Sequence, residues 1–297
     1  MYIDTHTHMD HRRFDSDRKS TIQTAKDSGI GILVNPAIEY ETNYRMRQML
    51  DGYDWIYYGV GIHPNRVGAD DTNDEEWEAG LMELAVRDNA KVVAIGETGL
   101  DFHRLNRNSA GEIDESGVIA LSRQYKWFRR QIQLASMARL PLILHIRNAN
   151  ESLLCESMHL DKDTKWNHID AHKEAIKILK EYQEDLQLDV KGVVHCYSSS
   201  DFAVAKEYID MGYMLGIGGT ATYSGNGKLR EILKKIPLTS IVLETDSPYV
   251  MPEGLAGKRN TPLNIPYIAK NLAEIKEIDV TEVEEITTQN ARRLFGL

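Results

Sequence analysis

Short apolar runs alternate with longer amphipathic stretches along the whole chain. Continuous runs of β-branched and other apolar residues are typical of strands buried on both faces of a parallel sheet. The predicted strands are Tyr2 to Thr5, Gly31 to Asn35, Tyr57 to Ile62, Val92 to Gly96, Leu142 to Leu144, Gly192 to Val194, Met214 to Ile217 and Ile241 to Glu244. The stretches between them predict helices, such as Ser20 to Ser28, Glu75 to Arg87, Tyr125 to Ala138, Lys173 to Tyr182 and Ala203 to Met211.

Alternation of strands and helices predicts an α/β protein. Eight strands joined by right-handed helical crossovers close into a (β/α)8 TIM barrel, and 297 residues suit one such barrel. We therefore predict a single domain over residues 1–297. A capping box, Thr281-x-x-Glu284, predicts the start of the last helix. We expect the apolar side of this helix to close the barrel.

Several predicted strands end in a histidine or a carboxylate. His6 and His8 are separated by one residue, so an extended chain aims both imidazoles at one point, as metal ligands require. Catalytic groups of a TIM barrel lie at the carboxyl ends of its strands. We expect the side chains at these ends to converge there: His6, His8, His63, Glu97, His145, His195 and Asp246.

The sequence around these positions resembles the TatD family of metal-dependent hydrolases, in order from Met1 to Phe295. The matching motifs are Thr5-His6-Thr7-His8-Met9-Asp10, Gly61-Ile62-His63-Pro64, Gly96-Glu97-Thr98-Gly99-Leu100-Asp101, Leu140-Pro141-Leu142-Ile143-Leu144-His145-Ile146-Arg147, His195-Cys196-Tyr197-Ser198 and Glu244-Thr245-Asp246-Ser247-Pro248-Tyr249. The resemblance implies a barrel with two divalent metal ions that hydrolyses phosphodiester bonds, typically as a deoxyribonuclease. It does not fix the substrate.

The resemblance also implies how the ligands are shared between the two ions. One ion would be held by His6, His8, Glu97 and Asp246, and the other by Glu97, His145 and His195. Glu97 is the expected bridge, because two ions roughly 3.5–4 Å apart can share a carboxylate. Imidazole ligands favour zinc, manganese or iron, while the carboxylates keep magnesium open, so the metal's identity stays open.

Each remaining candidate residue has a chemical role and a structural alternative. Asp246 can ligate a metal and also hold or deprotonate the attacking water. His63 exceeds what two metals need, so it is expected to contact the scissile phosphate or protonate the leaving oxygen; its alternative is a structural histidine at a strand end. Arg104 and Arg147 can grip phosphate oxygens, or they are solvated surface arginines.

Composition limits the partners of the chain. A net charge of −10 excludes a general nucleic-acid coating protein, but a nuclease that acts on strand ends needs only a local positive funnel. The expected partner is single-stranded DNA or another phosphodiester, with no membrane and no obligate protein partner. Two cysteines, no signal peptide and no stretch that approaches a membrane span lead us to expect a cytoplasmic protein.

The chain departs from the family pattern around the expected site. His103 stands where a tyrosine is usual, and Ile146 and Asn148 flank Arg147 where a small hydroxylic residue and an acid are common. A polar segment, Asn150 to Asp170, looks like an insertion beside the mouth of the barrel: a lid, a strand-stacking element that uses Trp166, or a solvated loop.

The sequence thus predicts a TatD-type 3′–5′ exonuclease on single-stranded DNA that uses a two-metal-activated water. Two other classes stay open. One is a binuclear-metal hydrolase of a small-molecule ester, amide or phosphate, and the other is a metal-binding module without catalysis. Intact Asp246 and His63 argue against the second.

Overall fold

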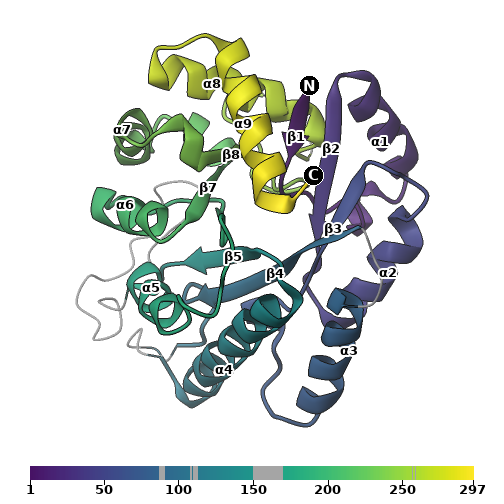
Figure 1. The fold of residues 1–297 in the computed structure, drawn as a ribbon, viewed down its shortest axis with the longest axis vertical. Coiled ribbons are helices and arrows are strands. Elements are labelled where there is room, and N and C mark those ends of the chain that lie inside the picture. Colours follow the sequence, from purple (N-terminus) through teal and green to yellow (C-terminus); the bar gives the residue numbers. More distant parts are fainter. Residues whose placement is uncertain (87–90, 108, 110–112, 150–169, 256, 258) are drawn as a thin grey trace.

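Eight parallel strands form one sheet in which each strand pairs with the next in the sequence (Figure 1). The computed structural model describes residues 1–86, 91–107, 109, 113–149, 170–255, 257 and 259–297. The strands are Tyr2–Asp4 (β1), Ile30–Pro36 (β2), Ile56–Val60 (β3), Val92–Asp101 (β4), Leu142–Arg147 (β5), Gly192–His195 (β6), Tyr213–Ile217 (β7) and Ile241–Leu243 (β8).

Residues directly after β1 close the sheet against β8 and the residues that follow it. The backbone N–H of Thr5 donates to the carbonyl of Leu243 at 3.0 Å, and the N–H of Asp246 donates to the carbonyl of His6 at 2.8 Å. Thr7 and Ser247 form a parallel bridge beyond them. The predicted (β/α)8 barrel is therefore confirmed.

Helices follow the strands and surround them (Figure 1). The α-helices are Arg18–Asp27 (α1), Tyr40–Leu50 (α2), Asp74–Val86 (α3), Glu115–Ala138 (α4), Ala171–Glu181 (α5), Phe202–Asp210 (α6), Gly227–Lys235 (α7), Ile265–Lys276 (α8) and Val280–Phe295 (α9). Short 3-10 helices are Arg12–Phe14 (η1), Pro64–Arg66 (η2), Gly219–Thr222 (η3), Leu238–Ser240 (η4) and Pro262–Asn264 (η5). None of the described helices is long and apolar enough to cross a bilayer.

Strand residues divide into two packed layers because successive side chains point to opposite faces. Leu33 and Leu144 belong to the outer layer, which includes the buried faces of the surrounding helices. Val34 and Ile143, their neighbours in sequence, belong to the inner layer, together with Phe295 of α9. Helix α9 thus packs its apolar side against the barrel, as the sequence predicted.

Strand β4 extends five residues beyond the predicted end at Gly96 and stays paired with β5 as far as Asp101 and Arg147. Two glycines allow this close pairing. A Cβ atom at Gly96 would collide with the carbonyl of Ile143, and a Cβ atom at Gly99 with the backbone of β5. Glu97 therefore lies inside a strand rather than after one.

Two predicted helix starts are wrong. Helix α4 begins at Glu115 rather than Tyr125, because the carboxylate of Asp114 accepts a backbone hydrogen bond and caps the helix. Helix α9 is capped by Asp279, whose carboxylate accepts the N–H of Thr281 at 2.8 Å. Thr281 therefore lies inside the helix, and the prediction that it is the N-cap is wrong.

The predicted insertion, apart from Asp170, lies outside the described residues, and so does its Trp166. Asp170 is the N-cap of α5: its carboxylate accepts the backbone N–H of His172 at 2.9 Å. The proposal of an inserted element between β5 and α5 thus stays a prediction.

Candidate metal centre

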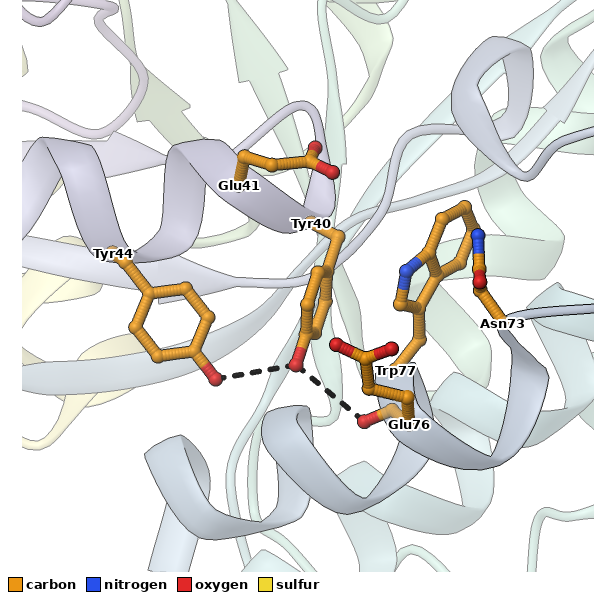
Figure 2. A pocket seen from close by; sticks show the side chains of 6 residues that line it. All are labelled: Tyr40, Glu41, Tyr44, Asn73, Glu76 and Trp77. Carbon is orange, nitrogen blue, oxygen red and sulfur yellow. Dashed lines mark hydrogen bonds between the residues drawn. The ribbon is translucent and has the colours of Figure 1, made fainter.

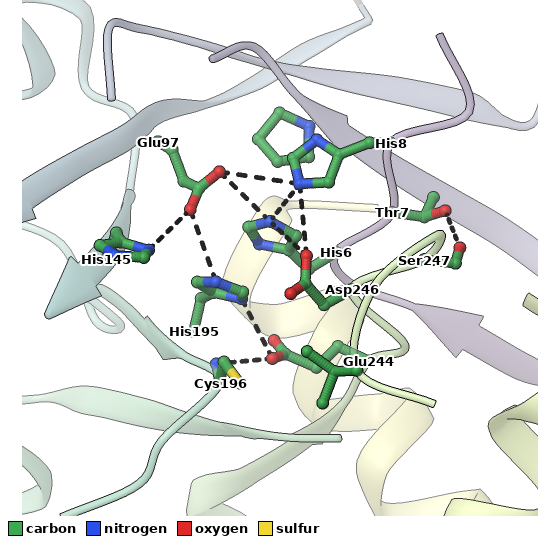
Figure 3. Close-up of polar contacts among 12 residues, drawn as sticks. His6, Thr7, His8, Glu97, His145, His195, Cys196, Glu244, Asp246 and Ser247 are labelled. Carbon is green, nitrogen blue, oxygen red and sulfur yellow. Dashed lines mark hydrogen bonds and ion pairs between the residues drawn. The ribbon is translucent and has the colours of Figure 1, made fainter. Parts of the chain in front are cut away.

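Four side chains from three parts of the barrel form a first group (Figure 3). His6 and His8 follow β1, where backbone hydrogen bonds from Thr5 and Thr7 to both neighbouring strands keep the chain extended. Their Nε2 atoms lie 3.2 Å apart. Oε2 of Glu97 is 3.5 Å from His6 Nε2, and Oδ1 of Asp246 is 3.3 Å from His8 Nε2.

A second group gathers around the other oxygen of the same glutamate (Figure 3). Oε1 of Glu97 lies 3.1 Å from His145 Nδ1, 3.4 Å from His195 Nε2 and 3.8 Å from His63 Nε2. The ligand atoms of Glu97, His145 and His195 lie within 4.8 Å of one another. Glu97 therefore presents one oxygen to each group, which is the arrangement of a bridging carboxylate.

Two buried carboxylates that sequence analysis did not assign hold the histidines of the second group. Oδ2 of Asp101 lies 3.2 Å from His145 Nε2, and Oε1 of Glu244 lies 3.1 Å from His195 Nδ1. Each carboxylate accepts the N–H of one ring nitrogen, and the other nitrogen, the one facing Glu97, is then the atom that would ligate a metal ion. Partners of this kind fix the tautomer of metal-binding histidines and raise their basicity.

A signal for both carboxylates was present in the sequence. Glu97 and Asp101 are four residues apart on one strand, and Glu244 and Asp246 are two apart, so each pair is spaced to share one face of an extended chain. Strand β4 was predicted to end at Gly96, so Asp101 was not expected to lie on the same strand as Glu97.

His63 is held by its own short helix. It is the N-cap of η2, and its Nδ1 accepts the backbone N–H of Asn65 at 3.1 Å. The proton of the neutral ring must then sit on Nε2, the atom that faces Glu97. Burial, together with the charge of His145, lowers the pKa of His63 to about 3, so the ring is a neutral hydrogen-bond donor.

Contacts with histidines keep the two carboxylates of the candidate ligand set ionised. Burial alone would raise the pKa of Glu97, but the nearby histidines, His6 foremost, hold it well below its ordinary value. Burial would likewise raise the pKa of Asp246, and the hydrogen bond with His8 lowers it. Burial would lower the pKa of His145, yet its bonds with Asp101 and Glu97 raise it to about 10.

This set of donors fits divalent metal ions. The two groups offer imidazole nitrogens and carboxylate oxygens, the donors that zinc, manganese and iron prefer, from carboxylates that are already ionised. The six predicted ligands meet at one end of the barrel: His6, His8, Glu97, His145, His195 and Asp246. Their assignment as ligands remains a proposal.

A cavity of about 890 Å³ opens over the centre. The predicted substrate contacts Arg104 and Arg147 line it, and so do Arg13 and Tyr249, which sequence analysis gave no role. Oδ1 of Asp101 accepts the backbone N–H of Arg104 at 3.2 Å and so fixes the segment that carries this arginine. The pocket thus combines the candidate metal ligands with cationic side chains.

A smaller pocket of about 410 Å³ lies away from the centre, between α2 and α3 (Figure 2). Tyr40, Tyr44 and Trp77 line it with two glutamates. The hydroxyl groups of Tyr40 and Tyr44 lie 3.3 Å apart. None of the residues that line this pocket belongs to the metal centre.

Comparison with known proteins assigns the chain to a family. The model of the TatD-related DNases matches residues 3–296. The chain belongs to this family. It is 35% identical over its whole length to an uncharacterized metal-dependent hydrolase, YabD of Bacillus subtilis, all of which is covered. It is 32% identical to the 3′-5′ ssDNA/RNA exonuclease TatD of a Rahnella species, over 96% of this chain and 94% of the relative.

The fold of TatD-related proteins agrees with the barrel. The crystal structure of YjjV, a TatD homologue from Escherichia coli, superimposes with a TM-score of 0.80 at 28% identity, over 100% of this chain and 98% of that one. The chain is thus a TatD-related member of a family of metal-dependent hydrolases.

The departures from the TatD pattern at His103, Ile146 and Asn148 lie outside the proposed ligand set. Ile146 is buried in the outer core layer. The side-chain oxygen of Asn148 accepts the N–H of Ala171 at 2.5 Å, and Nδ1 of His103 lies 3.2 Å from the carbonyl of Ala149. None of these three residues is among those that line the cavity over the metal centre.

Proposed function

We propose that this TatD-related chain is a two-metal phosphodiesterase that removes nucleotides from the 3′ end of single-stranded DNA. The observation that carries the proposal is the position of Glu97, whose two oxygens face two separate groups of ligand atoms. Bound metal ions would lower the pKa of water and stabilise the charge that develops on a phosphate. Their identity stays open among zinc, manganese, magnesium and iron.

The side chains of the centre take separate tasks in this proposal. Asp246, with its lowered pKa, is ionised at neutral pH and can orient and accept a proton from the attacking water. His63 donates a hydrogen bond from Nε2 to a phosphate oxygen, because Nδ1 is already occupied by Asn65. This assignment favours phosphate contact over protonation of the leaving oxygen. Arg104 and Arg147, which line the pocket, bind further phosphate oxygens.

The net charge of the chain and its similarity to an exonuclease support the end of a DNA strand as the substrate. The chain as a whole carries −10, and this net negative charge disfavours a duplex with its many phosphates. The arginines of the pocket place positive charge close to the metal groups. A relative from Rahnella, 32% identical, is named a 3′-5′ ssDNA/RNA exonuclease, and we extend its direction of attack to this chain.

The test uses single-stranded DNA labelled at each end, with phosphorothioate linkages at the 3′ or the 5′ terminus, and metal-loaded protein. A 3′ block should slow degradation far more than a 5′ block. Equal protection by the two blocks would contradict attack from the 3′ end.

Parallel assays separate the other function classes. Hydrolysis of p-nitrophenyl phosphate or of carboxylic esters, with DNA left intact, would replace the proposal by a small-molecule hydrolase. Bound metal without turnover of any substrate would indicate a binding module. Asp210→Asn removes one negative charge at an exposed position of α6, so it controls for any effect of net charge on these activities.

A further inference from the structure

Tyr249 lies in the turn that carries the candidate ligand Asp246. The backbone N–H of Tyr249 donates to the carbonyl of Asp246 at 2.8 Å. The side-chain amide of Asn260 donates to the carbonyls of Thr245 at 2.7 Å and Val250 at 3.0 Å, on both sides of the turn. The aromatic ring is therefore held at a fixed place relative to the metal groups.

Three side chains surround the ring while leaving it accessible. The imidazoles of His8 and His11 meet it edge to face, with centroids 5.9 and 5.4 Å away. The guanidinium carbon of Arg13 lies 5.7 Å from its centroid. Tyr249 is still 37% exposed, and it lines the cavity together with Arg13 and His8.

Arg13 is held in place through its backbone. It belongs to η1, and its N–H donates to Nδ1 of the capping residue His11 at 3.1 Å. Its carbonyl accepts a hydrogen bond from Arg259 at 2.9 Å. Arg259 itself is paired with Asp17 at 2.6 Å, whereas the Arg13 side chain forms no ion pair with any residue the structure describes. An exposed guanidinium thus stands beside an exposed aromatic ring.

We propose that Tyr249 and Arg13 form a nucleotide subsite beside the metal centre. The ring of Tyr249 stacks on the base of the nucleotide on the 5′ side of the scissile phosphate, and Arg13 binds the 5′-phosphate of that nucleotide. A ring that stacks on bases is indifferent to their sequence, since every base has a π face. The subsite selects nucleotides over phosphoesters without a base, and so deepens, and rests on, the proposed nuclease function.

Equilibrium binding tests the subsite apart from catalysis. Calorimetric titration of the metal-loaded protein compares thymidine 5′-monophosphate with 2-deoxyribose 5-phosphate, which carries the same phosphate without a base. Stacking predicts that the nucleotide binds at least about fivefold more tightly. Tyr249→Ala should bind the two ligands equally well and keep its metal content. Tyr249→Phe should keep the preference for the nucleotide. Arg13→Gln should lower the affinity for both ligands.

Tyr44→Ala is the matched control, because Tyr44 is a similarly exposed tyrosine on α2 that lines the smaller pocket between α2 and α3. It should leave the ratio unchanged. Equal affinity of the wild type for both ligands, or a ratio that survives Tyr249→Ala, would overturn the subsite. A wild type that prefers the nucleotide yet cleaves no DNA would support the subsite and contradict the proposed function, so the two failures are distinguishable.

Discussion

Oδ2 of Asp101 lies 3.2 Å from Nε2 of His145, and the same oxygen accepts the side-chain amide of Asn65 at 2.7 Å. The carboxylate holds the proton of His145 on Nε2, which leaves Nδ1 to face Glu97. Both residues are buried or nearly so, and water competes little for this bond. The second group of candidate ligands thus depends on a residue outside the proposed ligand set.

Asp101→Asn should weaken metal binding without unfolding the barrel. The amide has nearly the same shape but no charge, so His145 loses both its orienting partner and part of its basicity. Loss of such a partner lowers metal affinity by about 10- to 100-fold. Competition with a chelator of known affinity measures the change, with Asp210→Asn as control. Unchanged affinity would remove Asp101 from the metal centre.

Asp246→Asn should separate chemistry from folding. Asp246 has a φ of 54°, in the left-handed region that asparagine also tolerates, so the turn should persist. Loss of the base should lower kcat by at least about 100-fold. Steady-state kinetics on single-stranded DNA, with metal content and circular dichroism recorded alongside, give the answer. Wild-type kcat in this variant would refute the assigned role.

The pattern of apolar runs predicted the barrel and most of the candidate ligands, because both follow from simple periodicities. His6 and His8 share a face through their spacing, and strand ends of a barrel share an edge. The roles of Asp101 and of Tyr249 depend on side-chain distances between segments far apart in the chain. Periodicity within one segment carries no such information.

Asp74 lies outside the metal centre, where its carboxylate is surrounded by cationic side chains. Asp74 is buried, and its carboxylate accepts hydrogen bonds from Arg123 at 2.5 Å and from the indole of Trp127 at 3.0 Å. The carboxylate also pairs with Lys126 at 2.8 Å. The hydrogen bonds from Arg123 are the main reason that the pKa of Asp74 lies far below its ordinary value of 3.8.

The lowered pKa gives the sign of a pH effect on stability. The stabilisation is complete above the ordinary pKa of the unfolded chain and falls with pH below it, by about 1.4 kcal/mol per pH unit. Asp74→Asn should cost about 3 kcal/mol at pH 7, because it takes the buried counter-ion from Arg123, whose remaining ion pair is with the exposed Asp71. Urea unfolding measures the difference in the free energy of unfolding between wild type and Asp74→Asn. This difference should be the same at pH 7 and pH 5 and smaller at pH 3.

Asp189→Asn provides the control for Asp74. Asp189 pairs with Arg293 at 3.8 Å on the surface, with 83% of its side chain exposed, so its loss should change stability by less than about 1 kcal/mol. A gap between Asp74→Asn and wild type that stays the same from pH 7 to pH 3 would contradict the lowered pKa of Asp74.

Titration of the metal-free protein with one divalent metal tests the two-metal proposal most directly. Bound ions per chain and the rate of cleavage of end-labelled single-stranded DNA are measured on the same samples, for wild type and Glu97→Gln. A bridge at Glu97 predicts that cleavage rises until about two ions are bound per chain, and that Glu97→Gln neither binds the second ion tightly nor cleaves. Full cleavage with one ion per chain, or a Glu97→Gln variant that binds two ions and cleaves at the wild-type rate, would contradict it.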